Sequence, residues 1–319
     1  MIDIARASAP TDLILARAAA SEARIARMCI GLTWTTCSTG EGLGLAMSPG
    51  VASRVLPWPG TVAGRQVGEV AGWLSSWNPF EATVGLAAAN AIINSSGNPV
   101  MAGANALAPG NLAVFEHFRP RLDGRKVVVI GRYPGLDRVL KGLDVTVIER
   151  QPAEGDLPDT AAELVVPDAD WVFLTATTLI NKTFHRLAAL SREAVTVLMG
   201  PSMPWLAEWA EFGIDFLAGV TVIDPAKTEQ IAAEGGGTRL FEGGVQYAVA
   251  DIGQARMAAA KAEIANRVAR REALKAEMAS WHDSGNAGRF PRGAELVDID
   301  AKLSRLDTRF KRMWDARNG

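Results

Sequence analysis

The stretch RKVVVIGRYPG, residues 125–135, decides the fold of this 319-residue chain. Its continuous apolar run up to Gly131 is typical of a parallel strand that is buried on both faces. Further apolar runs follow it, and segments of helical character separate them. They are DVTVIER (144–150), DWVFLTATT (170–178), AVTVLMGP (194–201) and the stretch 214–224. Strands at this spacing predict right-handed crossovers and therefore an α/β fold with a doubly wound parallel sheet.

The residues before this sheet predict a smaller α+β unit. A first helix is expected to begin at Thr11 or Asp12 and to run to Met28, followed by a β-like stretch over 29–38. A second helix has clear start signals, since Asn78 can cap it, Pro79 fits its first position and Glu81 lies where a capping-box carboxylate belongs. Its body is rich in alanine and glycine, which favours close packing against another element.

Changes in composition divide the chain into three predicted domains. A linker rich in Gly, Asn and Pro covers about residues 95–111, so we expect a small N-terminal domain over 1–100 and a Rossmann-like domain over 101–250. Residues 251–319 are predicted to form a helical hairpin. The second helix of that hairpin has a coiled-coil-like seam of apolar residues: Leu296, Ile299, Leu303, Leu306, Phe310 and Met313.

Composition excludes several classes of function. Apolar residues make up 48% of the chain, charged residues make up 21% and the formal net charge is −2, so neither nucleic acid nor an anionic membrane is favoured as a partner. No apolar run approaches the roughly 18–20 residues that a membrane span needs. The first twenty residues contain Asp3 and Asp12 and read poorly as a signal peptide, which predicts a cytoplasmic protein.

Few residues that bind soft or borderline metal ions, such as cysteine and histidine, are present. The chain has two cysteines and three histidines, with no CxxC pair and no HExxH motif, so a structural zinc site is not expected. A metal held by this chain alone would have to be bound mostly by oxygen atoms.

The turn after the first parallel strand only half matches a dinucleotide-binding motif. Gly131 and Gly135 are present, but Tyr133 and Pro134 stand between them, where a bulky ring would crowd a dinucleotide and proline removes an amide. Glu149 does end the second strand, where a ribose-binding carboxylate belongs. NAD is therefore not expected as a cofactor.

An acidic loop follows the second strand. The segment ERQPAEGDLPD, residues 149–159, contains four carboxylates, and two prolines and a glycine are interspersed among them. One interpretation makes Glu149, Asp156 or Asp159 ligands of a metal ion or another cation, because open α/β sheets bind ligands at the carboxyl ends of their strands. The other is a solvated loop in which Asp159 caps the next helix.

Polar side chains also follow the later strands. The stretch 175–183 carries hydroxyls and an amide that could hold an anionic or polar ligand, although Asn181 or Thr183 could equally be a helix cap. The turn GPSMPW (200–205) is expected to expose Ser202, but no GxSxG elbow supports a nucleophile there. A buried Asn90 needs hydrogen-bond partners and is expected to face the domain interface. The predicted ligand-binding residues are Gly131, Tyr133, Pro134, Thr175, Thr177, Thr178, Asn181, Thr183, Gly200, Pro201 and Asn90.

The order of these motifs resembles the heavy-metal chelation family over about residues 12–250. The motifs are GLTWTT, the GEGLGLAMSP turn, NPFEATVGLAAANAIIN, VVVIGRYPG, VIERQPAEGDLPD, FLTATTLINKTF, MGPSMPW and LAGVTVIDP. The resemblance implies an enolase-N-terminal-like domain joined to a Rossmann-like domain, with a site in the cleft between them. The positions that match the family's motif loops are Gly131, Pro134, Glu149, Pro152, Asp156, Thr175, Thr178, Asn181, Thr183, Gly200 and Pro201.

Three functional hypotheses follow. The first is a protein that binds a metal ion or a metal chelate in the cleft, with Glu149 and Asp156 as metal ligands and the Thr/Asn loop completing the site. The second is an enzyme that acts on a nucleotide or a small anionic metabolite at the strand ends. The third is an accessory protein whose residues 251–319 bind a protein partner or a second copy of the chain.

Overall fold

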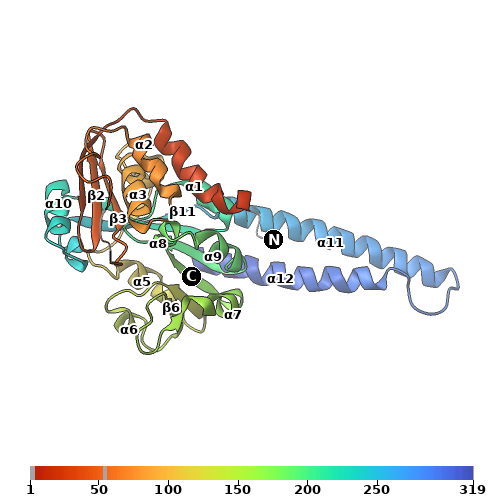
Figure 1. Ribbon diagram of the computed structural model, residues 1–319. Helices are drawn as coiled ribbons and strands as arrows, with labels where there is room; N and C mark the ends of the chain where they lie inside the picture. The colour runs from red at the N-terminus through yellow and green to blue at the C-terminus, as the bar shows by residue number, and fades with distance from the viewer. Residues whose placement is uncertain (1–3, 53–55, 319) are drawn as a thin grey trace.

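The computed structural model describes residues 4–52 and 56–318 (Figure 1). The N-terminal segment combines three helices with a three-stranded antiparallel sheet in the order β1-β2-β3. A short 3-10 turn, η1 (Gly72–Ser75), links α2 to α3. The elements of this segment are α1 (Ile4–Ala19), β1 (Ile25–Ile30), β2 (Trp34–Thr39), β3 (Leu43–Met47), α2 (Val67–Ala71) and α3 (Pro79–Ile93).

The bounds predicted for the first helix are wrong. Helix α1 already includes Ile4 and ends at Ala19, and residues 25–30 form β1 instead of a continuation of the helix. Met28 pairs with Cys37 across the antiparallel ladder. The run ARIARM has good helical propensity, but pairing with β2 satisfies its backbone groups and overrides that local preference.

Helix α3 begins where its start signals place it. The Asn78 side chain accepts a hydrogen bond from the Phe80 amide at 3.0 Å, and Pro79 occupies the first turn. The Glu81 carboxylate accepts from the Ser76 hydroxyl at 2.5 Å, and Ser76 in turn accepts from the Asn78 amide. The small residues of α3 permit close packing: a Cβ placed on Gly44 of β3 would lie 2.0 Å from the Ala87 carbonyl oxygen.

The second sheet has eight strands in the order β4-β11-β10-β9-β8-β5-β6-β7. The six strands β10, β9, β8, β5, β6 and β7 are parallel to one another. Strand β11 pairs antiparallel with both β10 and β4. The parallel part of the sheet starts in the middle at β5, continues outward to β7 and returns to β8 on the other side of β5. The strands are β4 (Asn105–Ala106), β5 (Lys126–Ile130), β6 (Asp144–Glu149), β7 (Leu157–Pro158), β8 (Trp171–Thr175), β9 (Val195–Met199), β10 (Phe216–Val222) and β11 (Val245–Asp251).

Short helices connect these strands. The α-helices are α4 (Pro99–Ala102), α5 (Ala113–Phe118), α6 (Leu136–Val139), α7 (Ala162–Val165), α8 (Thr177–Ile180), α9 (Phe184–Leu190) and α10 (Pro225–Ala233). The 3-10 turns are η2 (Arg119–Arg121), η3 (Asp159–Ala161), η4 (Val166–Asp168), η5 (Ala207–Phe212) and η6 (Thr238–Phe241). The predicted class, α/β with a mainly parallel sheet, a small second sheet and C-terminal helices, is confirmed.

The large sheet is buried on both faces. Alternate residues of β5 belong to different apolar clusters: Val128 and Ile130 pack with the residues of α3, whereas Val127 and Val129 pack with those of α5. The N-terminal segment thus shares a continuous core with one face of the large sheet. Within the predicted linker, β4 pairs with β11. The division at residues 100 and 250 stays a prediction.

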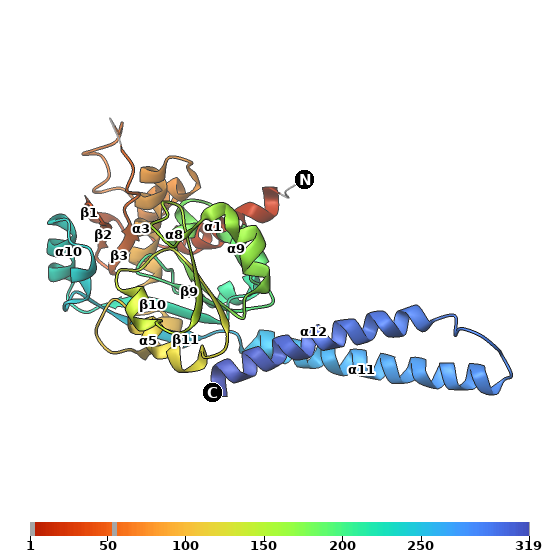
Figure 2. The same ribbon diagram turned by 90° about the horizontal axis from the view of Figure 1, so that it is seen from below.

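Two long helices end the chain. Helices α11 (Gln254–Asp283) and α12 (Gly293–Asn318) run side by side and extend away from both sheets (Figures 1 and 2). Leu274, Ile299 and Leu303 form a small apolar core between them. In the described part of the chain, no helix combines the length and the apolar character needed to cross a membrane.

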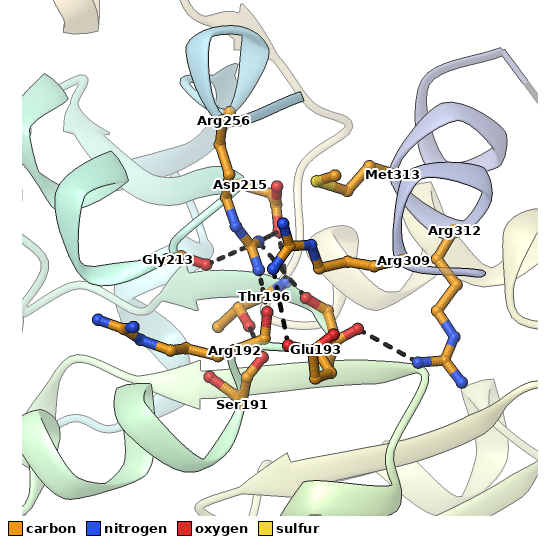
Figure 3. Close-up of polar contacts among 12 residues, drawn as sticks. Ser191, Arg192, Glu193, Thr196, Gly213, Asp215, Arg256, Arg309, Arg312 and Met313 are labelled. Atoms are coloured by element: carbon orange, nitrogen blue, oxygen red, sulfur yellow. Dashed lines mark hydrogen bonds and ion pairs between the residues drawn. The ribbon is translucent and has the colours of Figure 1, made fainter. Parts of the chain in front are cut away.

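Ion pairs attach the base of this helical pair to the large sheet (Figure 3). Asp215, at the start of β10, is fully buried, and its Oδ2 lies 2.5 Å from a guanidinium nitrogen of Arg256 in α11. Arg317 of α12 lies 3.7 Å from the other carboxylate oxygen and also pairs with Asp251 at 2.7 Å. Burial raises the pKa of Asp215, while the Arg256 charge acts in the opposite direction. One buried carboxylate therefore contacts both helices.

We expect Asp215→Asn to lower the free energy of unfolding by about 3–5 kcal/mol, because the half-buried Arg256 guanidinium would lose its fully buried counter-ion. Urea denaturation of the whole chain measures this loss. Asp298→Asn is the matched control, since Asp298 pairs with Lys302 on the exposed surface of α12 and should contribute less than about 1 kcal/mol. Equal losses in the two variants would show that the Asp215 pair does not anchor the helices.

Candidate functional site

Two adjoining hollows lie at the carboxyl ends of the parallel strands. The first, which we call the strand-end hollow, has a volume of about 450 Å3 and lies over the ends of β5 and β8, where the strand order reverses. Open α/β sheets bind ligands at such a point. The second, the interface hollow, measures about 680 Å3 and is lined by both the N-terminal segment and the large sheet. Both are lined by Glu149, Arg150, Thr177, Asn181 and Lys182, and together we call them the cleft.

The threonine-rich loop after β8 forms one wall of the strand-end hollow. Thr175, Thr177, Thr178, Asn181 and Thr183, all singled out from the sequence, line it together. The Thr175 and Thr177 hydroxyls lie 3.1 Å apart, and the Thr178 hydroxyl donates to the Thr175 carbonyl at 2.6 Å.

Asn181 organises the end of this loop. Its Oδ1 accepts both the Thr183 amide, at 3.1 Å, and the Thr183 hydroxyl, at 2.6 Å. Thr183 precedes α9 but makes no side-chain capping hydrogen bond to that helix. No described residue accepts a hydrogen bond from Nδ2 of Asn181, so this group remains available to a ligand.

The turn after β5 contributes only one of its predicted residues to the cleft. Gly131 lines the strand-end hollow and has a φ of +94°, and a Cβ there would come within 3.0 Å of the Thr175 methyl group. Tyr133 instead packs edge-on against Phe115, and burial raises the pKa of its hydroxyl to about 12. Pro134 is exposed outside the cleft.

Gly200, Pro201 and Asn90 also lie outside the cleft lining, and all three are buried. Asn90 donates from Nδ2 to the carbonyl oxygens of Leu45, at 2.8 Å, and Ser202, at 3.0 Å, so it joins the small sheet to the loop after β9. The expected exposure of Ser202 is wrong. This residue is fully buried because its hydroxyl accepts from the Met47 amide at 2.8 Å.

The carboxylate of Glu149 is used within the protein. It accepts amide hydrogen bonds from Arg132 at 2.9 Å and from Arg150 at 2.7 Å. A bound pyrophosphate would need amide donors from the turn that contains Arg132. Because the Arg132 amide already donates to Glu149, it is not free for a pyrophosphate. Glu149 still lines the cleft through the remainder of its side chain.

Asp156 lies apart from this cleft. Its Oδ1 pairs with Arg132 at 3.0 Å, its Oδ2 accepts from the Ala153 amide at 3.1 Å, and it lines a separate hollow beside α6. Both predicted metal ligands thus contact Arg132, but Glu149 lines the cleft and Asp156 lines the separate hollow. Within residues 4–52 and 56–318, no group of three or more His, Cys, Asp or Glu side chains could hold a metal ion.

Two cations of the cleft were not predicted. Arg150 belongs to the acidic loop 149–159 and Lys182 to the stretch 175–183, and both line the cleft. From the sequence, ligand binding is predicted for the neighbouring carboxylates and hydroxyls instead. Lys182 is the sole non-glycine residue with a positive φ, +66°, in the described chain. Such a backbone conformation costs about 1–2 kcal/mol, and nothing in the sequence signals it because glycine or asparagine is the usual residue there.

The Lys182 ammonium donates a hydrogen bond to the Leu74 carbonyl oxygen of η1. Burial lowers its pKa from 10.5 to about 8. This contact crosses from the large sheet to the N-terminal segment, so the lysine stem forms part of the cleft wall.

Comparison with known families accounts for most of the chain. Residues 13–93 match the family model DUF4213 and residues 113–251 match DUF364, and both families are described as "Putative heavy-metal chelation". The chain belongs to this family. An uncharacterized protein of Methanocaldococcus jannaschii is 29% identical over 176 residues, which are 53% of this chain and 65% of that protein. The chain therefore spans slightly less than two thirds of that relative's length.

Two crystal structures of DUF364 proteins with unknown function are similar to this structure. The Desulfitobacterium hafniense protein has a TM-score of 0.69 and 28% identity, with 76% of this chain and 98% of that chain covered. The Pyrococcus horikoshii protein has a TM-score of 0.64 and 21% identity, with 77% and 99% covered, and shows the fold alone. Since both family models end at or before residue 251, helices α11 and α12 lie outside them.

We expect Glu149→Ala to lower the free energy of unfolding by about 1–3 kcal/mol, because the Arg132 and Arg150 amides would lose their acceptor. Chemical denaturation checks this. Glu154→Ala is the control, since Glu154 is an exposed carboxylate of the same loop. Unchanged stability in Glu149→Ala would mean that the carboxylate is free in solution and available to a metal ion.

Proposed function

We propose that the cleft binds a small anionic organic molecule, and that a metal ion enters the cleft as a complex with such a molecule. The observation that carries this proposal is the pairing of two cations, Arg150 and Lys182, with neutral hydroxyl and amide groups along one cleft. The family description supports a role connected with metals.

The residues present do not fit a bare heavy-metal ion. Both Glu149 oxygens accept backbone amides, and Asp156 is paired with Arg132 in a separate hollow. Binding a metal through these groups would require breaking those contacts. Cys37 is not a substitute, because it is fully buried and burial raises the pKa of its thiol to about 12. A chelator that supplies its own donor atoms needs no such ligands from the protein.

The charge of the interface hollow favours an anion, since Arg150 and Lys182 line it with Glu149 as its only described carboxylate, whereas the strand-end hollow also contains the Asp159 carboxylate. Among the described residues, Arg150 and Lys182 form no ion pair, whereas Arg186 on the same wall is neutralised by Glu163. Glu149 is shielded by the amides that it accepts. One of the Thr175 and Thr177 hydroxyls donates to the other, so one hydroxyl proton and the Asn181 amide can donate further hydrogen bonds to carboxylate oxygens.

The interface hollow also offers an apolar surface. Met47, Val51 and Trp77 line it, and the Trp77 side chain is 84% exposed. An exposed indole beside cationic groups is suited to the carbon skeleton of an organic ligand. A hydrated metal ion would gain nothing from this surface, which again favours a chelate over a free ion.

The hypothesis of a nucleotide-binding enzyme has weaker support. Glu149 accepts the Arg132 amide and Tyr133 fills the turn, so the place where a pyrophosphate would lie offers few free donors. Residues 251–319 as a partner-binding or oligomerising segment remain a separate prediction.

The direct test compares nickel(II), citrate and their 1:1 complex as ligands, by calorimetry and by thermal denaturation. We expect citrate and nickel citrate to stabilise the native protein, because ligands that bind the folded state raise its melting temperature. Arg150→Ala should weaken this binding by about 10–100-fold, the loss of one charge-assisted hydrogen bond. Arg138→Ala removes the same charge from an exposed site outside the cleft and should leave the affinity for citrate and nickel citrate unchanged.

Elemental analysis of protein purified without chelators completes the test. Near-stoichiometric metal that disappears in Glu149→Ala, together with binding of free nickel but not of nickel citrate, would contradict the proposal and favour a metal site formed by the protein itself.

A further inference from the structure

Lys182 occupies a backbone position that does not suit it. It follows the C-cap of helix α8, and its φ of +66° is the conformation that glycine adopts most easily. Strain of this kind persists where the surrounding structure requires a particular side chain, and it is concentrated at functional sites. We therefore ask which contacts of the lysine side chain offset the strained backbone conformation.

The side chain leads into the region shared by the two hollows. Lys182 lines both of them, is half-buried, and donates to the Leu74 carbonyl oxygen. Glu149 and Arg150 line both hollows with Lys182, and Glu149 is already bound to backbone amides. The strand-end hollow also contains Asp159 and the Glu163–Arg186 ion pair. In the described chain no carboxylate forms an ion pair with Lys182, so its amine is not held by a counter-ion.

We propose that Lys182 is a reactive amine that forms an imine with an aldehyde or ketone group of an anionic ligand in the cleft. This inference rests on the proposed function, because Arg150 would bind the carboxylate of the same ligand. The class of ligand is thus an anionic carbonyl compound such as a 2-oxo acid.

The chemistry is balanced without a further reactant. The unprotonated Nζ attacks the carbonyl carbon, so that a nitrogen–carbon bond forms while the carbon–oxygen double bond becomes single. The oxygen gains one proton as the nitrogen loses one. The resulting carbinolamine loses water to give the imine, and hydrolysis reverses the sequence. Burial lowers the pKa of Lys182 to about 8, which leaves far more of this amine unprotonated at neutral pH than of an exposed lysine. Thr177 also lines both hollows, and its hydroxyl contacts that of Thr175.

The donation to Leu74 requires a long side chain that ends in a donor, which an arginine also provides, so this structural role does not by itself require a lysine. A residue that only closed α8 would be better as glycine or asparagine, and a residue that only attracted anions could be arginine without a depressed pKa. A lysine without a counter-ion at the centre of the cleft combines a nucleophile with the surroundings that activate it.

The test uses glyoxylate as the carbonyl probe and cyanoborohydride to reduce any imine to a stable carboxymethyl-lysine. After limited reaction of the whole folded chain at neutral pH, peptide mapping by mass spectrometry measures the rate at each lysine. We expect Lys182 to react at least about tenfold faster than the exposed Lys261 and Lys311. The preference should disappear in urea, and Lys182→Arg should leave only the slow background labelling.

Equal labelling rates at the three lysines of the folded chain would overturn the inference. Calorimetry with citrate, which has no aldehyde or ketone group, separates this result from the proposed function. Citrate binding without selective labelling contradicts the lysine inference alone, whereas selective labelling without citrate or nickel citrate binding contradicts the chelate proposal alone. Lys182→Met retains the aliphatic stem, and normal urea denaturation of this variant would show that loss of labelling is not loss of folding.

Discussion

The cleft depends on the way helix α3 packs against both sheets. Gly44 of β3 contacts the α3 backbone so closely that a single Cβ would collide with the Ala87 carbonyl. Asn90, on the same helix, donates to Leu45 of the small sheet and to Ser202 beyond β9. Because these donors are buried, sliding one sheet past the other would break two hydrogen bonds without replacement by water. The position of the N-terminal segment over the ends of the parallel strands is therefore fixed by α3, and the interface hollow is a consequence.

Within that frame, the parallel sheet and the threonine loop could be predicted from the sequence, because both depend on local pattern. Buried parallel strands are continuous apolar runs, and polar residues directly after β8 must lie at the carboxyl edge of the sheet. The separation of Glu149 from Asp156, which are both predicted from the sequence to be metal ligands, could not be predicted in the same way. Their separation depends on Arg132, whose amide contacts one carboxylate and whose guanidinium contacts the other. The end of the first helix was missed for a related reason, since strand pairing of Met28 with Cys37 overrode local propensity.

The internal use of the acidic groups determines what the cleft can bind. A carboxylate that accepts two amide hydrogen bonds is a weak candidate for a cation ligand, because each of those bonds would have to be given up. Cations without counter-ions have the opposite property, because an incoming anion can form charge-assisted hydrogen bonds with them; Arg150 is exposed and Lys182 is half-buried. The family description concerns metals, and the function proposed for the cleft concerns an anionic ligand. A metal complex with an anionic organic ligand is consistent with both.

Lys182 also links the chemistry of the cleft to its geometry. Its amine donates to Leu74 in η1, and a Cβ on Gly85 of α3 would lie 2.2 Å from the Leu74 amide nitrogen, so the acceptor belongs to the same close packing that places α3. Any movement of the N-terminal segment away from the sheet would expose the lysine to water and return its pKa toward the ordinary value. The reactivity inferred for this amine is thus conditional on the closed arrangement of the two segments. A ligand that contacts both walls of the interface hollow would stabilise that arrangement and, with it, the unprotonated form of Lys182.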